Sequence, residues 1–247
     1  KKYFELHPIE KIKLPKHQTN DIDDIPPGGR RMIGDAAKII RESGKWREAV
    51  QGCLAAGSFA DDCVGHVLSA LNKSAYKDNT VVVLWGDHGY DICEKTFAKS
   101  ALWQQTTRTP LIIHVPEKLG GNKRNANCKK PVSLIDLYPT LIELCGLPKN
   151  PKVEGRSIAP LVFDPQKKWP YPALITHSPH WHGPNHAVRS EQYHYIKYNR
   201  GGEELYDMYN DSDQLNNLAN KKEFDLIKEE LRKWMPKINT PHFRPKK

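Results

Sequence analysis

The residues with the clearest potential for chemistry are Asp87 and His88, which follow the apolar run 81–85 and are flanked by glycines. That run is rich in β-branched side chains and too short for a helix, so it predicts a buried strand. In open α/β sheets, ligands bind beyond the carboxyl ends of the strands. A carboxylate and an imidazole at such an end suit a divalent cation. The same residues also suit a plain turn, so spacing alone leaves both interpretations open.

Lys99 lies downstream of this pair, where the chain could fold back across the same pocket. A fixed ammonium group there would bind an anionic oxygen in both the ground state and the transition state. A surface lysine is otherwise simply solvated, so Lys99 alone indicates little. Arg108 precedes a Thr-Pro pair, and we expect it to brace the loop rather than to contact a substrate.

Alternating strands and helices predict the architecture that positions these side chains. Apolar residues recur at helical spacing over 45–71, and a second short apolar run at 110–115 predicts the next strand. The segment 133–146 predicts an amphipathic helix, with Ser133 as its N-terminal cap and Gly146 in the left-handed conformation after its last turn. This order indicates an α/β fold whose sheet is mostly parallel and covered by helices.

The two ends of the chain differ from this central part. Residues 1–29 are polar and rich in proline and aspartate, which favours an extended connecting segment over packed structure. Beyond about residue 148, loops rich in proline, histidine and glycine surround two strand candidates and a final helix, at 173–176, 193–198 and 223–234. We therefore divide the chain into an α/β core, residues 1–147, and a smaller C-terminal α+β subdomain, residues 148–247.

The composition suits a folded protein, since 38% of the 247 residues are hydrophobic and 27% are charged. The formal net charge of +9 suggests an anionic partner, either a nucleic acid or a sulfated or carboxylated polysaccharide. The basic residues are scattered, and no zinc finger, helix-turn-helix or RNA-binding aromatic pattern accompanies them. A solvated basic surface without a specific partner is the alternative. No apolar run approaches the length of a membrane span.

None of the five cysteines lies in a C-x-x-C pair, so the sequence does not favour a zinc or thioredoxin-like site. Cys53 and Cys63 lie too far apart along the predicted helix to form a disulfide. Because the count is odd, at least one thiol is unpaired within the chain. We expect most of the five to be buried as small apolar side chains.

Several short motifs occur in the order found in formylglycine-dependent sulfatases. The region 85–112 resembles the C-terminal motif of that family, which belongs to the alkaline-phosphatase-like superfamily. Segments on either side resemble further family motifs, namely 6–8, 24–26, 58–65, 134–141, 154–157, 186–189, 203–208 and 216–219. The resemblance covers nearly the whole chain. It is nearest to the iduronate-2-sulfatase-like branch, and it concerns only the C-terminal portion of those enzymes.

This resemblance implies a sulfatase, a sulfuric ester hydrolase that acts on a sulfated sugar or polysaccharide. Asp87 and His88 would be calcium ligands, and Lys99 would be a catalytic residue that contacts the sulfate. The residues that would line the substrate pocket are Lys99, Asn185, His186 and Arg189. The nearby loop residues His180, Trp181 and His182 could also contact sugar.

One part of the family pattern is missing. The family's nucleophile, a formylglycine, is made from the first residue of a C/S-x-P-x-R motif, and this sequence has no such motif. We expect the nucleophile upstream of Lys1, so that this chain holds one half of the active site and the N-terminal half of the sulfatase fold is its partner. The family also implies a secreted, periplasmic or lysosomal location, with no nucleic acid partner and no membrane span.

Three explanations of the missing motif remain open. The chain would be a processed part of a two-chain enzyme, a truncated enzyme, or a non-catalytic descendant that only binds sulfated glycans. The first two are favoured because Asp87 and His88 remain as in the family. A phosphatase or phosphonate hydrolase of the same superfamily is a further alternative, since the nucleophile would decide the reaction. A nucleic-acid-binding module is the most distant one.

Overall fold

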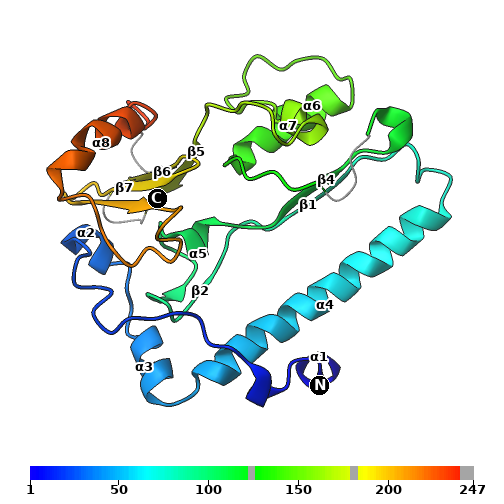
Figure 1. Cartoon of the computed structure of the whole chain (residues 1–247). Helices are drawn as coiled ribbons and strands as arrows, with labels where there is room; N and C mark the ends of the chain where they lie inside the picture. The colour runs from blue at the N-terminus through cyan, green and yellow to red at the C-terminus, as the bar shows by residue number, and fades with distance from the viewer. Residues whose placement is uncertain (122–125, 179–182, 240–247) are drawn as a thin grey trace, which may run out of the picture.

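The computed structural model describes residues 1–121, 126–178 and 183–239. Its helices, with 3-10 helices labelled η, are α1 (Lys2–Glu5), η1 (Ile9–Lys11), α2 (Pro27–Arg30), α3 (Ala36–Glu42), α4 (Trp46–Lys73), α5 (Gln104–Thr107), η2 (Glu117–Leu119), η3 (Leu134–Asp136), α6 (Leu137–Leu144), α7 (Ala159–Phe163), η4 (Lys222–Phe224) and α8 (Asp225–Arg232). Its strands are β1 (Val82–Trp85), β2 (Asp91–Ile92), β3 (Phe97–Ala98), β4 (Leu111–His114), β5 (Ala173–His177), β6 (Asn185–Arg189), β7 (Tyr193–Lys197) and β8 (Glu203–Asp207). Figure 1 shows their arrangement. Within the described ranges, no helix is both long enough and apolar enough to cross a membrane.

Small sheets organise the described residues. β1 pairs with β4, β2 pairs with β3, and the remaining strands form a sheet in the order β5-β6-β7-β8. Each of these pairs is antiparallel. The mostly parallel sheet predicted from the sequence is therefore not found in the described part of the chain. A parallel neighbour needs a long crossover, usually a helix, whereas the chain between β1 and β4 forms only the β2–β3 ribbon and the single turn of α5.

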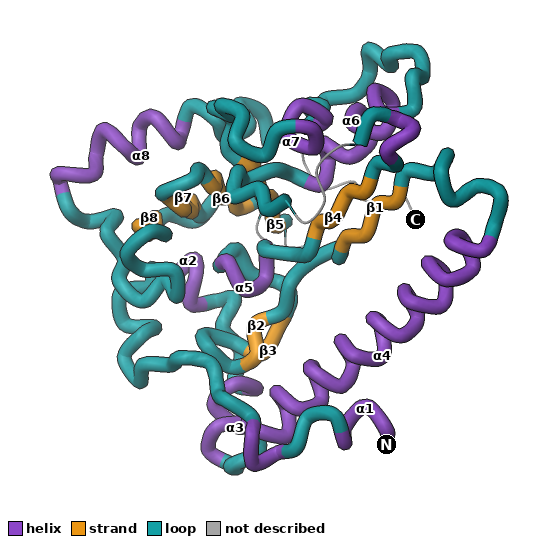
Figure 2. The backbone as a smooth tube through the Cα atoms, turned by 45° about the vertical axis from the view of Figure 1, so that its right-hand side comes forward, coloured by secondary structure: helices purple, strands orange, loops and turns teal. Residues whose placement is uncertain are grey.

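The sheet β5–β8 is covered on both faces, because successive side chains of a strand point to opposite sides. On one face Ala187 and Ile196 pack against Trp103, just before α5. On the other face Val188 packs against Leu231 of α8. Figure 2 shows α5 and α8 on opposite sides of this sheet. The face towards α5 belongs to a core that joins residues from both predicted parts of the chain.

The opening segment is packed, contrary to the extended connection predicted from its polar composition. Ile25 is 1% exposed and belongs to the same core as Trp103 and Tyr206. Asp21 is also buried, at 3% exposed. Ile22 and Ile25 lie among prolines and aspartates without a longer periodic pattern, so the local sequence could not predict that Ile25 is buried while Ile22 is exposed.

The long helix predicted over 45–71 forms without a break as α4, but little of it is covered. Of its 28 residues, only Val50 and Ala55 are buried. Phe59 and Val67 are 54% and 69% exposed. In Figures 1 and 2 the C-terminal half of α4 stands apart from the β1–β4 pair.

β1 forms where it was predicted, but it is not a buried central strand. Trp85 is 51% exposed, and Ile112 of β4 is 57% exposed. The whole chain exposes 16380 Å². A compact monomer of its mass, 28.3 kDa, would expose only about 11,000 Å². Among the described residues, no layer covers the apolar faces of β1, β4 and α4 as such faces are usually covered.

The helix predicted over 133–146 is confirmed as η3 followed by α6. Ser133 and Asp136 form a capping box at its start. Gly146 has a φ of +64°, the left-handed conformation expected after the last turn. The hydroxyl oxygen of Ser133 also accepts the N–H of Leu174 at 3.0 Å, which ties the start of this helix to β5.

The C-terminal elements were predicted only in part. The strand candidates at 173–176 and 193–198 are confirmed as β5 and β7, and the final helix as η4 and α8. β6 and β8 have no clear signal in the sequence. Because both faces of the sheet are covered, the alternation of polar and apolar residues that marks a half-buried strand is missing from them.

The expectation that most cysteines are buried is wrong. Cys93 is buried and Cys53 is half-buried, whereas Cys63, Cys128 and Cys145 are exposed, and all five are free thiols. Cys63 lies on the uncovered stretch of α4. Its exposure follows from the absence of a neighbouring layer there.

A buried ion pair ties the opening segment to the middle of the chain. The ammonium nitrogen of Lys95 lies 2.7 Å from Oδ1 of Asp21, and both side chains are 1% exposed. The same ammonium lies over the rings of Trp103 and Tyr206, at 5.9 and 5.8 Å from their centres. Surroundings of low polarity strengthen the attraction between the two charges. Burying either charge without the other would lower the stability of the fold.

Glu204 of β8 extends this arrangement into the C-terminal sheet. Its carboxylate is fully buried and accepts hydrogen bonds from Nε1 of Trp103 at 2.8 Å and from the hydroxyls of Tyr198 and Tyr206 at 2.5 Å each. Burial raises the pKa of Glu204, and these three donors oppose the rise. We call the six residues Asp21, Lys95, Trp103, Tyr198, Glu204 and Tyr206 the central polar cluster.

Replacing Lys95 by methionine should leave Asp21 buried without its partner. We expect the free energy of unfolding to fall by about 3–5 kcal/mol, the usual cost of breaking a buried ion pair. Lys16→Met is the matched control, because Lys16 forms a 2.9 Å pair with Asp213 while its side chain is 78% exposed. That change should alter stability little. Chemical denaturation measures both variants, and equal losses would contradict the prediction.

Candidate functional site

The tetrapeptide after β1 is held against α5 and the residues that follow it. The N–H of Gly86 donates to the carbonyl oxygen of Pro110 at 3.1 Å, and the N–H of Gly89 donates to that of Thr106 at 2.9 Å. A Cβ on Gly89 would lie 2.1 Å from the carbonyl oxygen of Gln105. This close approach of two backbones requires glycine at position 89 and determines where the two side chains between the glycines point.

Asp87 and His88 lie next to each other at this strand end. Nε2 of His88 is 3.5 Å from Oδ2 of Asp87. Nδ1 of His88 lies 2.7 Å from the carbonyl oxygen of Gly89, so Nδ1 carries the proton in the neutral ring and Nε2 keeps its lone pair. The side chain of Asp87 is 84% exposed and that of His88 is 35% exposed. Both groups are therefore accessible to an ion or a ligand.

The pair fits one side of a divalent cation site. A carboxylate oxygen and an imidazole nitrogen with a free lone pair lie close enough to share one ion. Calcium, however, takes about six to eight ligands, mostly oxygen. Within the described ranges, no group of three or more His, Cys, Asp or Glu side chains could surround a metal. The described residues therefore offer a cation only this pair of neighbouring side chains.

Lys99 follows β3 directly, at the end of the β2–β3 ribbon. It is exposed, and it has no hydrogen-bond or ion-pair partner among the described residues. Its ammonium group is therefore available to an anion. The ribbon also contains Lys95 of the central polar cluster, so the position of Lys99 depends on that buried ion pair.

The turn of the ribbon is held from inside by Asp91, which is fully buried. Oδ1 of Asp91 accepts the N–H groups of Glu94 at 3.0 Å and Thr96 at 3.2 Å. Burial and the neighbouring Glu94 carboxylate raise the pKa of Asp91. From outside, Nε1 of Trp46 donates to the carbonyl oxygen of Ile92 at 2.6 Å, which fixes the ribbon against the start of α4.

The predicted substrate residues on β6 point to two different faces of the sheet. Asn185 and Arg189 share the face of Ala187, which packs towards α5, whereas His186 shares the face of Val188, which packs towards α8. Nδ1 of His186 lies 3.0 Å from Oγ1 of Thr176, and its Nε2 lies 2.8 Å from Oδ1 of Asn239. His186 is 9% exposed. The structure thus brings Asn185 and Arg189 to one side and His186 to the other.

Arg189 connects this face of the sheet to α5. Its Nε donates to Oε1 of Gln104 at 3.4 Å, and its Nη1 donates to the carbonyl oxygens of Ser190 and Glu191. Nη2 has no hydrogen-bond partner in the described part of the chain. Burial, and to a lesser extent the charge of Arg108, lower the pKa of Arg189. An anion beside Nη2 would offset that repulsion.

Arg108 was expected to brace its loop, and its backbone is placed to do so. Its N–H donates to the carbonyl oxygen of Gln104 at 2.8 Å, and its own carbonyl oxygen would lie 2.6 Å from a Cβ on Gly89. Its side chain is exposed and has no bond to another described residue. The turn of α5 therefore touches the Asp87–His88 loop through Gly89, and it touches Arg189 through Gln104.

A supporting layer beneath α5 was missed in the sequence analysis. Gln214 is fully buried; its Nε2 donates to Nδ1 of His194 at 3.0 Å, and its Oε1 accepts the N–H of Gln104 at 2.6 Å. His194 pairs with Arg189 across the strands. Burial lowers the pKa of His194 to about 3, so the ring is neutral. No local pattern marks these residues, because strand register pairs His194 with Arg189 and the loop after β8 brings Gln214 to them.

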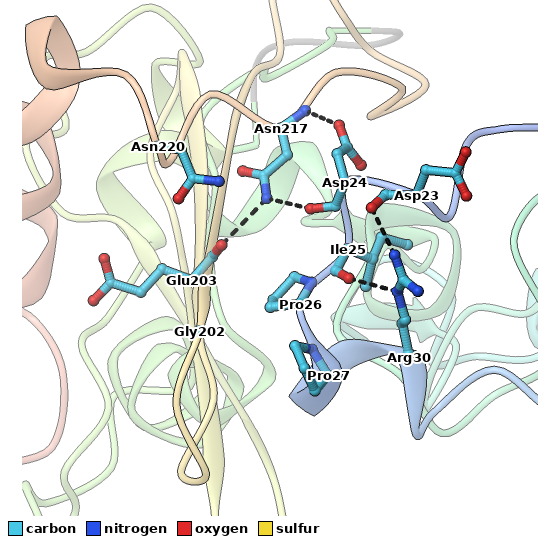
Figure 3. Close-up of a pocket in the computed structure, with 10 residues that line it drawn as sticks. All are labelled: Asp23, Asp24, Ile25, Pro26, Pro27, Arg30, Gly202, Glu203, Asn217 and Asn220. Atoms are coloured by element: carbon cyan, nitrogen blue, oxygen red, sulfur yellow. Dashed lines mark hydrogen bonds between the residues drawn. The ribbon is translucent and has the colours of Figure 1, made fainter.

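The loop residues His180, Trp181 and His182 lie outside the described residues. A shallow cavity of about 460 Å³ lies elsewhere, between the opening segment and the β7–β8 hairpin (Figure 3). Its lining groups bond to one another: Asn217 donates to the carbonyl oxygens of Asp24 and Glu203, at 3.0 and 3.2 Å. No predicted site residue lines this cavity, which is a junction between two segments of the chain.

Two family models match the chain. The model described as "N-sulphoglucosamine sulphohydrolase, C-terminal" matches residues 86–240, and the model described as "Sulfatase" matches residues 15–147. This chain belongs to the sulfatase family. Both matches include the strand end that carries Asp87 and His88.

Individual sulfatases support this assignment. A sulfatase of Formosa agariphila is 38% identical over 243 residues, which cover 96% of this chain and 46% of the relative. A solved 2-O GAG sulfatase superposes with a TM-score of 0.72 at 24% identity, over 90% of this chain and 51% of the other. A phosphonate monoester hydrolase from Silicibacter pomeroyi superposes with a TM-score of 0.77 at 19% identity, over 94% and 51%. These structures show the shared alkaline-phosphatase-like fold, and this chain spans about half the length of each protein.

Gly89→Ala should disturb the Asp87–His88 loop, because the new Cβ would meet two backbone carbonyl oxygens, at 2.1 and 2.6 Å. We expect a loss of about 1–3 kcal/mol in the free energy of unfolding, typical of overpacking. Gly34→Ala is the control, since no atom lies within 4 Å of the position of its Cβ. Thermal unfolding of both variants measures the difference. An unchanged midpoint for Gly89→Ala would show that the loop is not held as described.

Proposed function

We propose that this chain supplies one half of the active site of a sulfatase that hydrolyses sulfate esters of a sugar or polysaccharide. The position of α5 supports this most directly, because it contacts the Asp87–His88 loop and Arg189 together. A cation-binding pair and a guanidinium group with an unpaired edge suit a sulfate group. The identity to a sulfatase across 96% of the chain supports the reaction, and the match to the model described as "N-sulphoglucosamine sulphohydrolase, C-terminal" supports a sulfated sugar as the class of substrate.

Each residue has a separate task in the proposed site. Asp87 and His88 would hold calcium, which when bound supplies positive charge near the sulfate oxygens. Lys99 binds the sulfate through its free ammonium group and stabilises negative charge that develops on oxygen during the reaction. Arg189 orients the anionic substrate with its unpaired Nη2, and Asn185 lies on the same face. His186, on the opposite face, would support the strand that carries them.

We further propose that the nucleophile, a formylglycine, lies in the N-terminal half of the fold with the remaining cation ligands. The relatives are about twice as long as this chain, which leaves room for such a half. The uncovered faces of β1, β4 and α4 are suitable surfaces for it, since covering them would bury side chains such as Trp85 and Ile112. In this proposal the missing motif reflects a division of the site rather than loss of activity.

Within the family we propose membership of the iduronate-2-sulfatase-like branch, based on the Asp-His pair at the end of β1 and the collinear motifs around it. The secreted, periplasmic or lysosomal location expected for that branch is part of the same proposal. The phosphonate hydrolase alternative is not favoured, because its likeness to this chain is one of fold, at 19% identity, whereas both family models are those of sulfatases.

The chain by itself should not release sulfate from an aryl or sugar sulfate, because no residue in it can form the proposed covalent intermediate. The measurement is sulfate release by the purified 247-residue chain, with a metal-stripped sample as the control. Addition of the N-terminal half of a close relative, such as the 38%-identical sulfatase, should restore turnover. Turnover by the chain alone, well above the control, would contradict the divided site.

In the complete enzyme, Asp87→Asn should weaken calcium binding and lower turnover by at least about 100-fold, the scale of losing one main electrostatic stabiliser. Lys99→Ala should slow turnover while calcium affinity stays nearly unchanged, because Lys99 would contact the substrate and not the metal. Lys149→Ala, an exposed lysine outside the proposed site, is the control.

Calcium titration and sulfate release distinguish the two roles in that pair of variants. If Asp87→Asn keeps the wild-type calcium affinity and rate, the metal assignment is wrong. If Lys99→Ala lowers calcium affinity as strongly as Asp87→Asn does, the separation of tasks is wrong.

A further inference from the structure

Two aromatic side chains contact an exposed arginine beside the C-terminal sheet, and a third packs against one of them. The guanidinium carbon of Arg156 lies 4.6 Å from the centre of the Tyr171 ring and 5.8 Å from that of Trp234. Tyr171 also meets Trp169 and Trp234 edge to face, at 5.0 and 6.0 Å between ring centres. We call these four residues the Arg156 cluster. Figures 1 and 2 show the end of α8 beside the segment that leads into β5. Trp234 follows α8, and Trp169 and Tyr171 precede β5.

The guanidinium of Arg156 differs from most others in the described part of the chain. Arg30, Arg41 and Arg232 donate their side-chain N–H groups to carbonyl or carboxylate oxygens. Only the backbone N–H of Arg156 is bonded, to Oδ1 of Asp136 at 2.8 Å, and its side chain has no hydrogen-bond or ion-pair partner among the described residues. Stacking on the rings holds the planar group in place while its donors remain free.

The surroundings of the cluster are basic and partly apolar. Arg156 is exposed, and Trp169, Tyr171 and Trp234 are half-buried, so ring surface remains open to solvent. Lys167 and Lys168, directly before Trp169, are exposed and form no ion pair with any described residue. Positive charge beside flat apolar rings is the combination that a charged sugar chain would fit, because sugar C–H faces pack on rings and acidic groups pair with guanidinium.

The cluster is separate from the proposed catalytic site. Trp234 packs with Val188 and Tyr195 on the face of the sheet that is covered by α8. Arg189 and α5 lie on the other face. A ligand on the Arg156 cluster would therefore not occupy the position of a substrate at Asp87, His88 and Lys99.

We infer that the Arg156 cluster is a second binding surface, for a segment of an anionic polysaccharide. Sulfate or carboxylate groups of the polymer pair with Arg156 and with Lys167 and Lys168, and the sugar rings lie against Trp169 and Tyr171. The surface retains a long substrate chain next to the enzyme and contributes nothing to a small one. This inference does not depend on the proposed reaction, since binding can be measured without turnover.

Direct binding of dextran sulfate, with uncharged dextran as the comparison ligand, tests the inference by calorimetry at low and moderate salt. Arg156→Ala should weaken binding of dextran sulfate by about tenfold, the loss of affinity expected when one strong charge-assisted hydrogen bond is removed. Arg156→Lys should restore only part of it, because the ammonium group keeps the charge without the planar stack. Arg200→Ala is the matched control, since Arg200 is an exposed arginine in the β7–β8 hairpin without a ring contact.

Two outcomes would overturn the inference. One is that Arg156→Ala and Arg200→Ala lose the same affinity, which would mean that net charge alone attracts the polymer. The other is that Arg156→Ala lowers the unfolding temperature but leaves the affinity unchanged, which would make the cluster a packing contact. Binding of a single-stranded DNA with equal affinity and equal sensitivity to Arg156→Ala would likewise contradict a saccharide surface.

Turnover measurements separate this surface from the catalytic site. In the complete enzyme, Arg156→Ala should raise KM for a sulfated polymer and leave kcat/KM for a small aryl sulfate unchanged. A loss with both substrates would place Arg156 in the catalytic machinery and contradict a separate surface. If the enzyme has no sulfatase activity at all, the dextran sulfate titration still decides the inference, so the two proposals fail independently.

Discussion

Lys95 and Asp21 carry opposite charges in a place that water does not reach, and each charge is tolerable there because of the other. The pair joins the opening segment to the β2–β3 ribbon, and the rings over Lys95 belong to Trp103 and Tyr206. Through Glu204 the same arrangement reaches the C-terminal sheet. The central polar cluster therefore links the beginning, the middle and the end of the chain. The predicted site residues lie on or next to the segments that it joins.

The single turn of α5 connects this buried core to the loop and the strand that carry predicted site residues. It lies against the sheet through Gln214, receives Arg189 through Gln104, and accepts the N–H of Gly89 from the loop that carries Asp87 and His88. A turn this short has little stability of its own. Its position comes from contacts with three separate parts of the chain, so the order of the predicted site residues depends on the core beneath them.

The uncovered faces show a different constraint. α4 and the β1–β4 pair present apolar side chains to solvent, and the chain exposes far more surface than a compact protein of its mass. The proposed cation site likewise has no group of three or more His, Cys, Asp or Glu ligands among the described residues. The proposed division of the site between this chain and a further layer of the sulfatase fold would account for both features.

The sequence by itself determined the local elements and the family. The β-branched run gave β1, helical spacing gave α4, and the collinear motifs indicated a sulfatase, because each of these signals depends on residues that are close neighbours or occur in a fixed order. Only the tertiary structure decided that β1 and β4 are antiparallel, that His186 faces away from Arg189, and that Asp21 and Lys95 are buried together. Those properties arise from contacts between residues far apart in the chain, where strand register and the exclusion of water, rather than local pattern, determine which side chains meet.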